Sequence, residues 1–299
     1  MTDSLDAPKL VDRLLDLLAD SYVFPKRAAA AGELLRANLS TGKYDAPVDE
    51  GLCERLNEDL FEACRDKHLR LIWHPAADGD EPPASEEDLV AGLREQFRLE
   101  NQGVRRVEQL PGNVGAIQLT IIPPATTAGG SIAAAMELVK DTEALILDLR
   151  ETRGGAPDGV ALWCSYLLPD GEVHLNDVVQ GPHGPTRQYW TSGHVAGPRY
   201  AERPVYVLVS SATFSGGEEL AYDLKVIGRA TIVGETTRGG AHPSTVLSLG
   251  DHVELRLPVA RSVSPITGGN WEAIGVEPDI PTTAAEALDV ALASLARGL

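Results

Sequence analysis

Ser215 has the residue type and the position of a nucleophile. The apolar run that begins at Val205 is typical of a strand, and the segment from Gly216 is typical of a helix with two acidic residues in its first turn, where they suit the helix dipole. Ser215 therefore lies directly before a helix N-terminus, where backbone N–H groups can stabilise an anion. Serine also favours this position as a simple N-cap, and the sequence leaves both interpretations open. No G-x-S-x-G motif surrounds the serine, which argues against a standard α/β-hydrolase.

A pair of glycines in the segment LDLRETRGGAP, residues 147–157, is a second candidate feature. Gly154 and Gly155 follow a predicted strand that ends at Arg150, and glycines there let backbone N–H groups approach a ligand. Neither G-x-x-x-x-G-K-[ST] nor G-x-G-x-x-G is present, so a nucleotide site is not expected. The pair fits an oxyanion hole, and a plain turn is the alternative.

A serine nucleophile needs a general base, and histidine is the most frequent one. No H-E-x-x-H or H-x-H pattern occurs, so we expect no zinc site and no other metal or cofactor. His68 follows a predicted helix, and His242 lies in a loop after a predicted strand. The sequence offers both as partners for Ser215 and does not choose between them. The chain has seven histidines: His68, His74, His174, His183, His194, His242 and His252.

The elements that must position these residues divide the chain in two. Apolar residues recur every three or four positions over 10–22 and 52–64, and residues 26–39 are rich in Ala and Leu, which predicts a three-helix bundle. From Gly103 onward, β-branched runs such as VGAIQLTII, ALILDLR, VYVLVSS and ATIVGE alternate with helical segments. This alternation predicts a buried, largely parallel sheet. The strict alternation of HVELRL, residues 252–257, predicts a half-exposed strand.

We therefore expect an α/β protein in three parts. Residues 1–75 form an all-α N-terminal helical domain, and residues 76–105 form a linker and a connecting helix. Residues 106–299 form the α/β core that carries the chemistry.

Composition excludes several classes of protein. The 299 residues include 26 Lys and Arg against 44 Asp and Glu, a formal net charge of −18 that repels polyphosphates, so a nucleic-acid partner is not expected. Three cysteines are too few for a disulfide framework and favour reduced thiols. The first residues lack the basic and apolar regions of a signal peptide, and no apolar run reaches the roughly 18 residues of a membrane span. These features predict a cytoplasmic protein.

The order of several segments resembles that of a known family. LADSYVFP and DKHLRL come early, and VEQLPGNVG, ALILDLRETRGGAP, VYVLVSSATFSGGEELAYDL, GETTRGGAHP and PITGGNWEAIGVEPDI follow. Together they resemble the tail-specific, or C-terminal processing, serine peptidases of family S41, and most closely the repeats of interphotoreceptor retinoid-binding protein and their bacterial relatives. The resemblance implies a crotonase/ClpP-like core on a spiralling sheet, preceded by a helical domain.

The resemblance also implies roles for residues. Ser215, in TFSGGEE, would be the nucleophile, and the oxyanion hole would use the N–H of Gly216 and that of Gly154 or Gly155.

The implied base depends on the branch of the family. Processing proteases use a lysine in a G-K-G segment, and that position is Gly240 here. Arg238 cannot replace the lysine, because a guanidinium stays protonated. The tricorn-like branch uses Ser, His and Glu, and His68 in DKHL and Glu272 in WEAIGVEPD match its pattern. The resemblance therefore implies a Ser215–His68–Glu272 triad.

The expected function is that of a serine hydrolase, a peptidase on short peptides, because residues 76–105 are too few for the PDZ domain usual in the family. Two alternatives stay open. One is a carrier of an apolar small molecule, as in the retinoid-binding relatives, and the other is a hydrolase repurposed for another acyl-transfer reaction. The expected partner is a peptide or small-molecule substrate, with no nucleic acid and no membrane, and self-association into a homo-oligomer stays open.

Overall fold

The computed structural model describes residues 5–75, 86–182, 184–250 and 252–298. The chain forms two compact units, one of residues 1–83, 178–187 and 242–262 and the other of residues 84–177, 188–241 and 263–299. The sequence-based boundaries at residues 75 and 105 stay a prediction. Residues 76–85 of the predicted linker lie outside the described residues, and the connecting helix is α4 (Glu86–Leu99).

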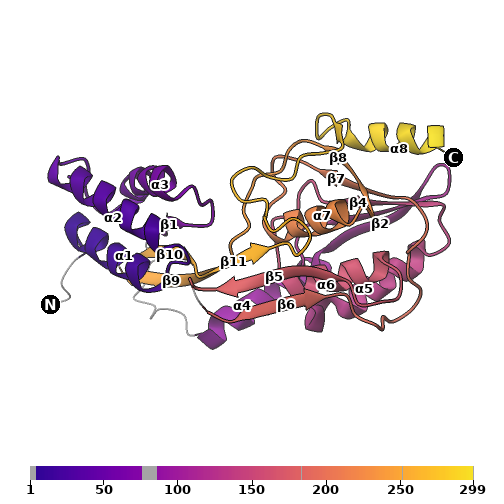
Figure 1. The fold of residues 1–299 in the computed structure, drawn as a ribbon, viewed down its shortest axis with the longest axis horizontal. Helices are drawn as coiled ribbons and strands as arrows, with labels where there is room; N and C mark the ends of the chain where they lie inside the picture. The colour runs from indigo at the N-terminus through magenta and orange to yellow at the C-terminus, as the bar shows by residue number, and fades with distance from the viewer. Residues whose placement is uncertain (1–4, 76–85, 183, 251, 299) are drawn as a thin grey trace. The chain divides into compact units, whose positions relative to one another are not determined.

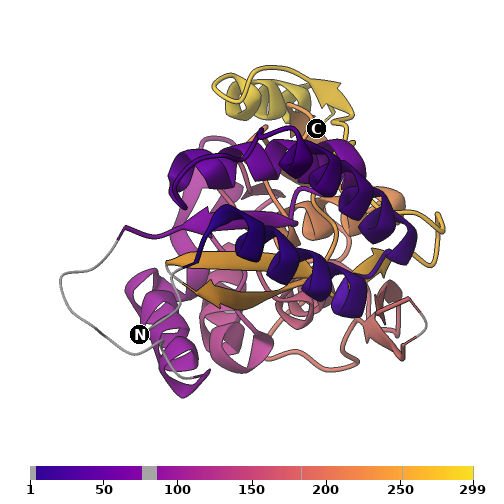
Figure 2. The same cartoon turned by 90° about the vertical axis from the view of Figure 1, so that its left-hand side faces the viewer.

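The first unit combines three helices with a small antiparallel sheet (Figure 2). Asp6 caps the first helix by accepting from the Lys9 amide at 3.0 Å, and Asp49 caps the third by accepting from the Leu52 amide at 2.9 Å. The sheet has the order β1-β10-β9. The elements are α1 (Ala7–Ser21), α2 (Pro25–Ser40), α3 (Glu50–Cys64), β1 (Arg70–Trp73), β9 (Ser244–Gly250) and β10 (Val253–Pro258).

The apolar core of this unit joins the helices to the strands. Leu14, Leu56 and Leu60 are fully buried in the same cluster as Leu255 and Leu257 of β10. The alternating exposure predicted for HVELRL is confirmed, because β10 turns one face into this core. The three predicted N-terminal helices are confirmed, and the structure adds a small sheet to them: amphipathic helices must bury their apolar stripes, and here part of the partner surface comes from strands about 200 residues later in the sequence.

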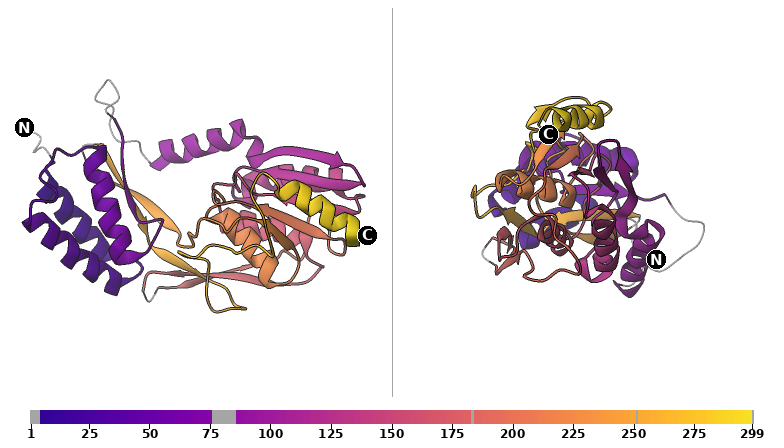
Figure 3. Two further views of the ribbon diagram at one scale, coloured as in Figure 1. Left: turned by 90° about the horizontal axis from the view of Figure 1, so that it is seen from above. Right: turned by 90° about the vertical axis from the view of Figure 1, so that its right-hand side faces the viewer.

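The second unit is an α/β layer structure around a six-stranded sheet of order β12-β8-β7-β4-β3-β2 (Figures 1 and 3). Only the β2–β3 pair is antiparallel in this described sheet, so the predicted buried, largely parallel sheet is confirmed. Its strands are β2 (Val104–Leu110), β3 (Val114–Leu119), β4 (Ala144–Asp148), β7 (Val205–Val209), β8 (Thr231–Gly234) and β12 (Ile280–Pro281).

Helices cover both faces of this sheet. In β4, Leu145 and Leu147 pack on the side of α5, α6 and α7, whereas Ala144 and Ile146 pack on the side of α8. This burial of both faces explains why the strand is an unbroken apolar run in the sequence. The helices are α5 (Ala125–Val139), α6 (Pro157–Leu167), α7 (Gly216–Val226) and α8 (Ala287–Gly298).

The remaining elements are short. A 3-10 turn, η1 (Asn101–Gly103), precedes β2, and a third sheet has the order β11-β5-β6. Within the part of the chain that is described, no helix has both the length and the apolar character needed to cross a membrane. The three strands of the third sheet are β5 (His174–Gln180), β6 (Thr186–Trp190) and β11 (Ala260–Val263).

Candidate active site

Ser215 lies in a strained turn between β7 and α7, in the second unit. Its backbone has φ 52° and ψ −120°, a region that residues other than glycine seldom adopt and that concentrates at functional sites. The turn is fixed from both sides, because the Phe214 amide donates to the Thr152 carbonyl at 3.0 Å and the Thr213 hydroxyl donates to the Leu149 carbonyl at 2.9 Å. The serine is half-buried at the start of the helix, as the sequence predicts.

Glu218 holds this turn against the loop that follows β8. Its carboxylate is fully buried and accepts from the Ser215 amide at 2.8 Å, from the Thr237 hydroxyl at 2.5 Å, and from the amides of Gly239 and Gly240 at 2.5 and 2.9 Å. Burial raises the pKa of Glu218 above its ordinary value, against the lowering effect of these four donors. One carboxylate therefore connects the serine turn to residues 237–240.

The Gly154-Gly155 turn lies directly against the serine. A methyl group at Gly154 would lie 3.0 Å from Ser215 Cβ and 3.5 Å from its Oγ, and a methyl group at Gly216 would lie 2.8 Å from the Gly155 nitrogen. Gly155 has φ 151° and pairs with Ile122, whose carbonyl leaves no room for a side chain. The structure thus brings the serine together with the glycines predicted for the oxyanion hole.

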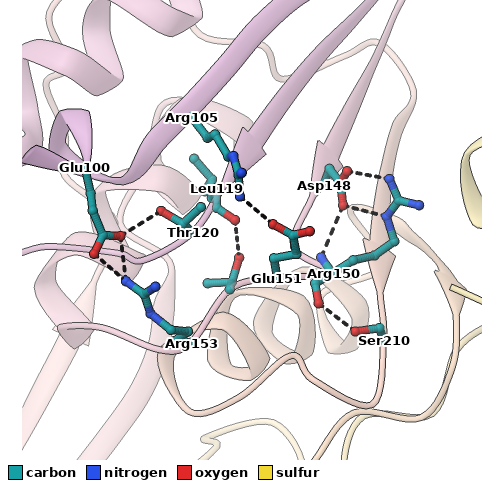
Figure 4. A network of polar contacts seen from close by, with 10 residues as sticks. Glu100, Arg105, Leu119, Thr120, Asp148, Arg150, Glu151, Arg153 and Ser210 are labelled. Carbon is teal, nitrogen blue, oxygen red and sulfur yellow. Dashed lines mark hydrogen bonds and ion pairs between the residues drawn. The ribbon is translucent and has the colours of Figure 1, made fainter. Parts of the chain in front are cut away.

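A polar network anchors the loop that carries these glycines (Figure 4). Arg153 donates to both carboxylate oxygens of Glu100, at 2.6 and 2.5 Å. The guanidinium of Arg150 makes a two-pronged contact with Asp148, at 2.8 and 2.7 Å, and the Arg150 carbonyl accepts from the Ser210 hydroxyl at 2.6 Å. These bonds fix both ends of the segment between β4 and the glycine pair, so that its backbone N–H groups are preorganised.

Glu272 lies on a loop that is tied to the same region of the second unit. Its Oε2 accepts from the Ala241 amide at 2.6 Å, and the neighbouring Trp271 donates from its indole nitrogen to the Gly240 carbonyl at 2.8 Å. The Ala273 amide donates in turn to the Gly239 carbonyl at 3.1 Å. The residues bonded to Glu218 are thus also bonded to the glutamate loop, and the carboxyl group of Glu272 is half-buried.

His68 belongs to the first unit, in the short connection between α3 and β1. The helix ends at Arg65, whose φ of 49° turns the chain, and the His68 amide donates to Asp66 Oδ1 at 3.0 Å. Asp66 also accepts from Tyr22 Oη at 3.0 Å and contacts His242 Nδ1 at 2.8 Å. His242 is nine-tenths buried or more and packs on the Phe24 ring at a centroid distance of 4.9 Å.

The predicted site residues therefore lie in both units. Ser215, Gly216, Gly154 and Gly155 come together in the second unit, which also holds Glu272, whereas His68 lies in the first.

Two buried polar residues near these positions, Asp66 and Glu218, were missed by sequence reasoning, and the sequence offered His242 as a base for Ser215 but not as a partner of Asp66. Glu218 had a signal, since Ser-x-x-Glu at the start of a helix is the spacing of a capping box. The Asp66–His242 contact had none, because it joins residues 176 positions apart.

Comparison with known proteins decides the family. Residues 113–282 match the model of peptidase family S41, and residues 4–107 match the model described as the N-terminal domain of Peptidase_S41 in eukaryotic IRBP. The chain belongs to peptidase family S41.

Individual relatives of the S41 chain agree with this assignment. It is 31% identical over 266 residues to carboxyl-terminal-processing peptidase 2 of Arabidopsis thaliana, an alignment that covers 85% of this chain and 48% of that one. It is 33% identical over 177 residues to a C-terminal processing peptidase of Tetradesmus obliquus, covering 57% and 36% of the two chains. The solved structure of the photosystem II D1 C-terminal processing protease has the same fold, with a TM-score of 0.56 at 18% identity over 94% of each chain. The S41 chain spans about half the length, or less, of these curated relatives.

The prediction of a cytoplasmic protein is wrong. The relatives named from Arabidopsis thaliana and Tetradesmus obliquus are chloroplastic. The sequence argument failed because sparse cysteines are not specific to the cytoplasm: the three thiols of the S41 chain are all buried and need no disulfide in any compartment.

Proposed function

We propose that the S41 chain is a serine peptidase with Ser215 as its nucleophile. The observation that carries this proposal is the strained Ser215 turn, held by the buried Glu218 and lying against the Gly154-Gly155 turn. Backbone strain of this kind costs about 1–3 kcal/mol and persists where the surroundings fix it, most often at functional sites. A serine that served as an N-cap alone would not require it.

In the proposed reaction, Ser215 Oγ attacks the scissile carbonyl carbon and forms a tetrahedral intermediate. The oxygen that becomes negative accepts from the N–H of Gly216 and from that of Gly154 or Gly155. His68 removes the serine proton and later returns it to the leaving amine, and Glu272 stabilises the imidazolium. Water then releases the acyl group by the same route in reverse.

A lysine base is not supported. At the position that corresponds to the lysine of processing proteases, the Gly240 amide donates to Glu218 and no side chain is present. The nearby Arg238 stacks over the Phe214 ring at 4.7 Å, and a guanidinium does not serve as a general base. These contacts favour histidine as the base and therefore a Ser-His-Glu mechanism. Short peptides are proposed as substrates for a different reason, namely that residues 76–105 are too few for a PDZ domain.

The test is covalent labelling with a fluorophosphonate, followed by peptide mapping. We expect wild-type protein to be modified at Ser215 and the Ser215→Ala variant to be unmodified. Ser211→Ala is the matched control, since Ser211 is exposed in the same turn, and it should be labelled at the wild-type rate. Folded wild-type protein that resists the reagent at millimolar concentration would rule out the peptidase.

A groove in the first unit favours a second candidate function, that of an apolar-ligand carrier. The groove has a volume of about 550 Å³, with a floor of Val23, Phe24, Pro25 and Pro182 and with Lys26, Arg27 and Arg261 also lining it. Such a surface suits an apolar molecule with an anionic end. Saturable binding of a long-chain carboxylate, abolished by Phe24→Asp, together with no labelling of Ser215, would favour the carrier over the peptidase.

A further inference from the structure

We propose that Asp66 is a positioning residue that orients His68 and supplies a negative charge beside it. This inference rests on the proposed function, in which His68 is the base. Asp66 is the first residue of the DKHL segment, but the resemblance assigned it no role; that role follows from the contacts of one buried carboxylate within the first unit.

The Asp66 carboxylate is a meeting point of three distant parts of that unit. Its Oδ1 accepts from the His68 backbone amide at 3.0 Å, two residues away. Its Oδ2 accepts from Tyr22 Oη at 3.0 Å, 44 residues away, and contacts His242 Nδ1 at 2.8 Å, 176 residues away. Asp66 is 1% exposed, so water does not compete for these bonds.

Because the connection between α3 and β1 is short, the Asp66 carboxylate can hold the turn that contains His68. Only five residues separate the end of α3 at Cys64 from the start of β1 at Arg70, and Arg65 reverses the chain at φ 49°. Within this short connection, the bond from Asp66 sets the direction of the His68 backbone. Phe24 packs against the ring of His242, which holds that partner in place from the other side.

The contacts of Asp66 also favour its charged form. Burial alone would raise the pKa of Asp66, but the hydrogen bond and charge of His242, with His68 beside it, hold that pKa below its ordinary value. Other charged groups of this unit near the cluster are Arg65 and Lys67, which flank Asp66 in sequence, and Arg27, which donates to the Cys64 carbonyl at 2.9 Å. An ionised Asp66 therefore favours the imidazolium that forms when His68 accepts the serine proton.

Asp59 provides a matched control in the same unit. It is 3% exposed and accepts from a tyrosine, Tyr44, at 2.5 Å and from Lys43 at 2.6 Å, and its hydrogen-bond partners among the described residues lie outside the His68 turn. Asp59→Asn and Asp66→Asn thus remove the same charge from equally buried sites, and only the second change touches His68.

The experiment is an NMR titration of the His68 ring in the full chain, together with the rate of fluorophosphonate labelling at Ser215. In Asp66→Asn we expect the midpoint of the His68 titration to fall by at least about 0.5 pH unit, because the imidazolium loses a negative neighbour, and labelling to slow at least tenfold. In Asp59→Asn both values should equal those of wild type, even where the melting temperature falls. An unchanged midpoint in folded Asp66→Asn, or an equal shift in Asp59→Asn, would overturn the inference.

Two tyrosine variants cover the case in which Asp66→Asn does not fold. Tyr22→Phe removes one donor to Asp66, and Tyr44→Phe removes one donor to Asp59. The His68 backbone amide resonance should move in the first variant and stay in place in the second; a resonance unmoved in both would overturn the proposal. Because the NMR readouts need no activity, a shifted His68 in a protein that is never labelled would refute the peptidase while sustaining the role of Asp66.

Discussion

Glu272 has one observed contact and one proposed role, and replacement by glutamine separates the two. Its carboxylate accepts the Ala241 amide at 2.6 Å, a bond that the oxygen of a glutamine can also accept, whereas the proposed stabilisation of an imidazolium needs the charge. We therefore expect Glu272→Gln to melt near the wild-type temperature and to be labelled at Ser215 at least about a hundredfold more slowly. Stopped-flow labelling and thermal melts check this, with Glu277→Gln, an exposed site on the same loop, as the control. A fully reactive Glu272→Gln would remove the residue from the mechanism.

At Gly155 the lack of room for a side chain beside the backbone predicts the effect of a substitution. An added Cβ would lie 2.0 Å from the Ile122 carbonyl oxygen, at a φ of 151° that is already unfavourable for other residues. Gly155→Ala should lower the melting temperature and abolish labelling, because the chain must move away from Ser215. Gly171 has a similar φ of 154° but nothing within 4 Å, so Gly171→Ala should retain labelling. Equal effects of the two changes would show that the cost lies in φ and not in the close approach.

For individual residues, the sequence predicted the features that depend on neighbouring residues in the chain. Ser215 before a helix and glycines after a strand are local patterns, and the structure places them together in the second unit. The sequence placed Glu218 in the first turn of the helix, where it suits the dipole, and the structure adds that it is buried under four donors that come largely from another loop. Such burial depends on tertiary contacts that no local pattern reports, and the triad itself stays a prediction.

Helix α7 carries an unusual pair of acids one turn apart on its buried side. Glu219 accepts from Asn176 at 2.9 Å, and burial raises its pKa to about 7. Asp223 is 1% exposed, and neither of its carboxylate oxygens has a hydrogen-bond partner among the described residues. Burial, and then the neighbouring Glu219, raises the pKa of Asp223 well above its ordinary value. The helix that follows Ser215 therefore buries a carboxyl group whose protonated form is favoured in the folded protein.

The sign of the resulting pH dependence follows from linkage. Above about pH 4 the unfolded chain releases the Asp223 proton while the folded protein keeps it, so this group costs stability increasingly as the pH rises toward the folded-state pKa. Asp223→Asn should raise the free energy of unfolding at pH 8, and by a smaller amount at pH 5. Urea melts at the two values measure this, with the exposed Asp16→Asn as the control. A variant less stable than wild type at pH 8 would contradict the neutral state of Asp223.

Elements were predictable where periodicity was strong. The apolar run at β4, the helix after Ser215 and the α1 stripe all form as expected, because each pattern matches the face it buries. The pairing of β9 and β10 with β1 was not predictable, since the choice of partner across the chain depends on packing against the helices and not on the strands themselves.

For the whole molecule, the division into units explains why no single segment contains the proposed triad. His68 precedes the α/β elements in sequence. The first unit also contains residues 178–187 and 242–262, and the second unit contains the C-terminal residues 263–299. Residue 242 lies directly after Ala241, the residue whose amide bonds Glu272.

The net charge of −18 makes a prediction about substrates that involves the entire surface. A field of this sign raises the local concentration of cationic peptides and accelerates their encounter, and salt screens it over a Debye length of about 8 Å at 0.15 M ionic strength. Two peptides identical around the scissile bond, one flanked by lysines and one by glutamates, separate this effect from specific contacts. At 20 mM salt, as a low-screening condition, we expect kcat/KM to be at least about threefold higher for the lysine peptide, with similar kcat, and the difference to vanish near roughly 0.5 M salt.

A preference for the glutamate peptide would contradict control by the net field and would point to the basic side chains lining the first unit's groove, Lys26, Arg27 and Arg261. A lysine preference that persists undiminished in high salt would also contradict it, because only direct contacts resist screening.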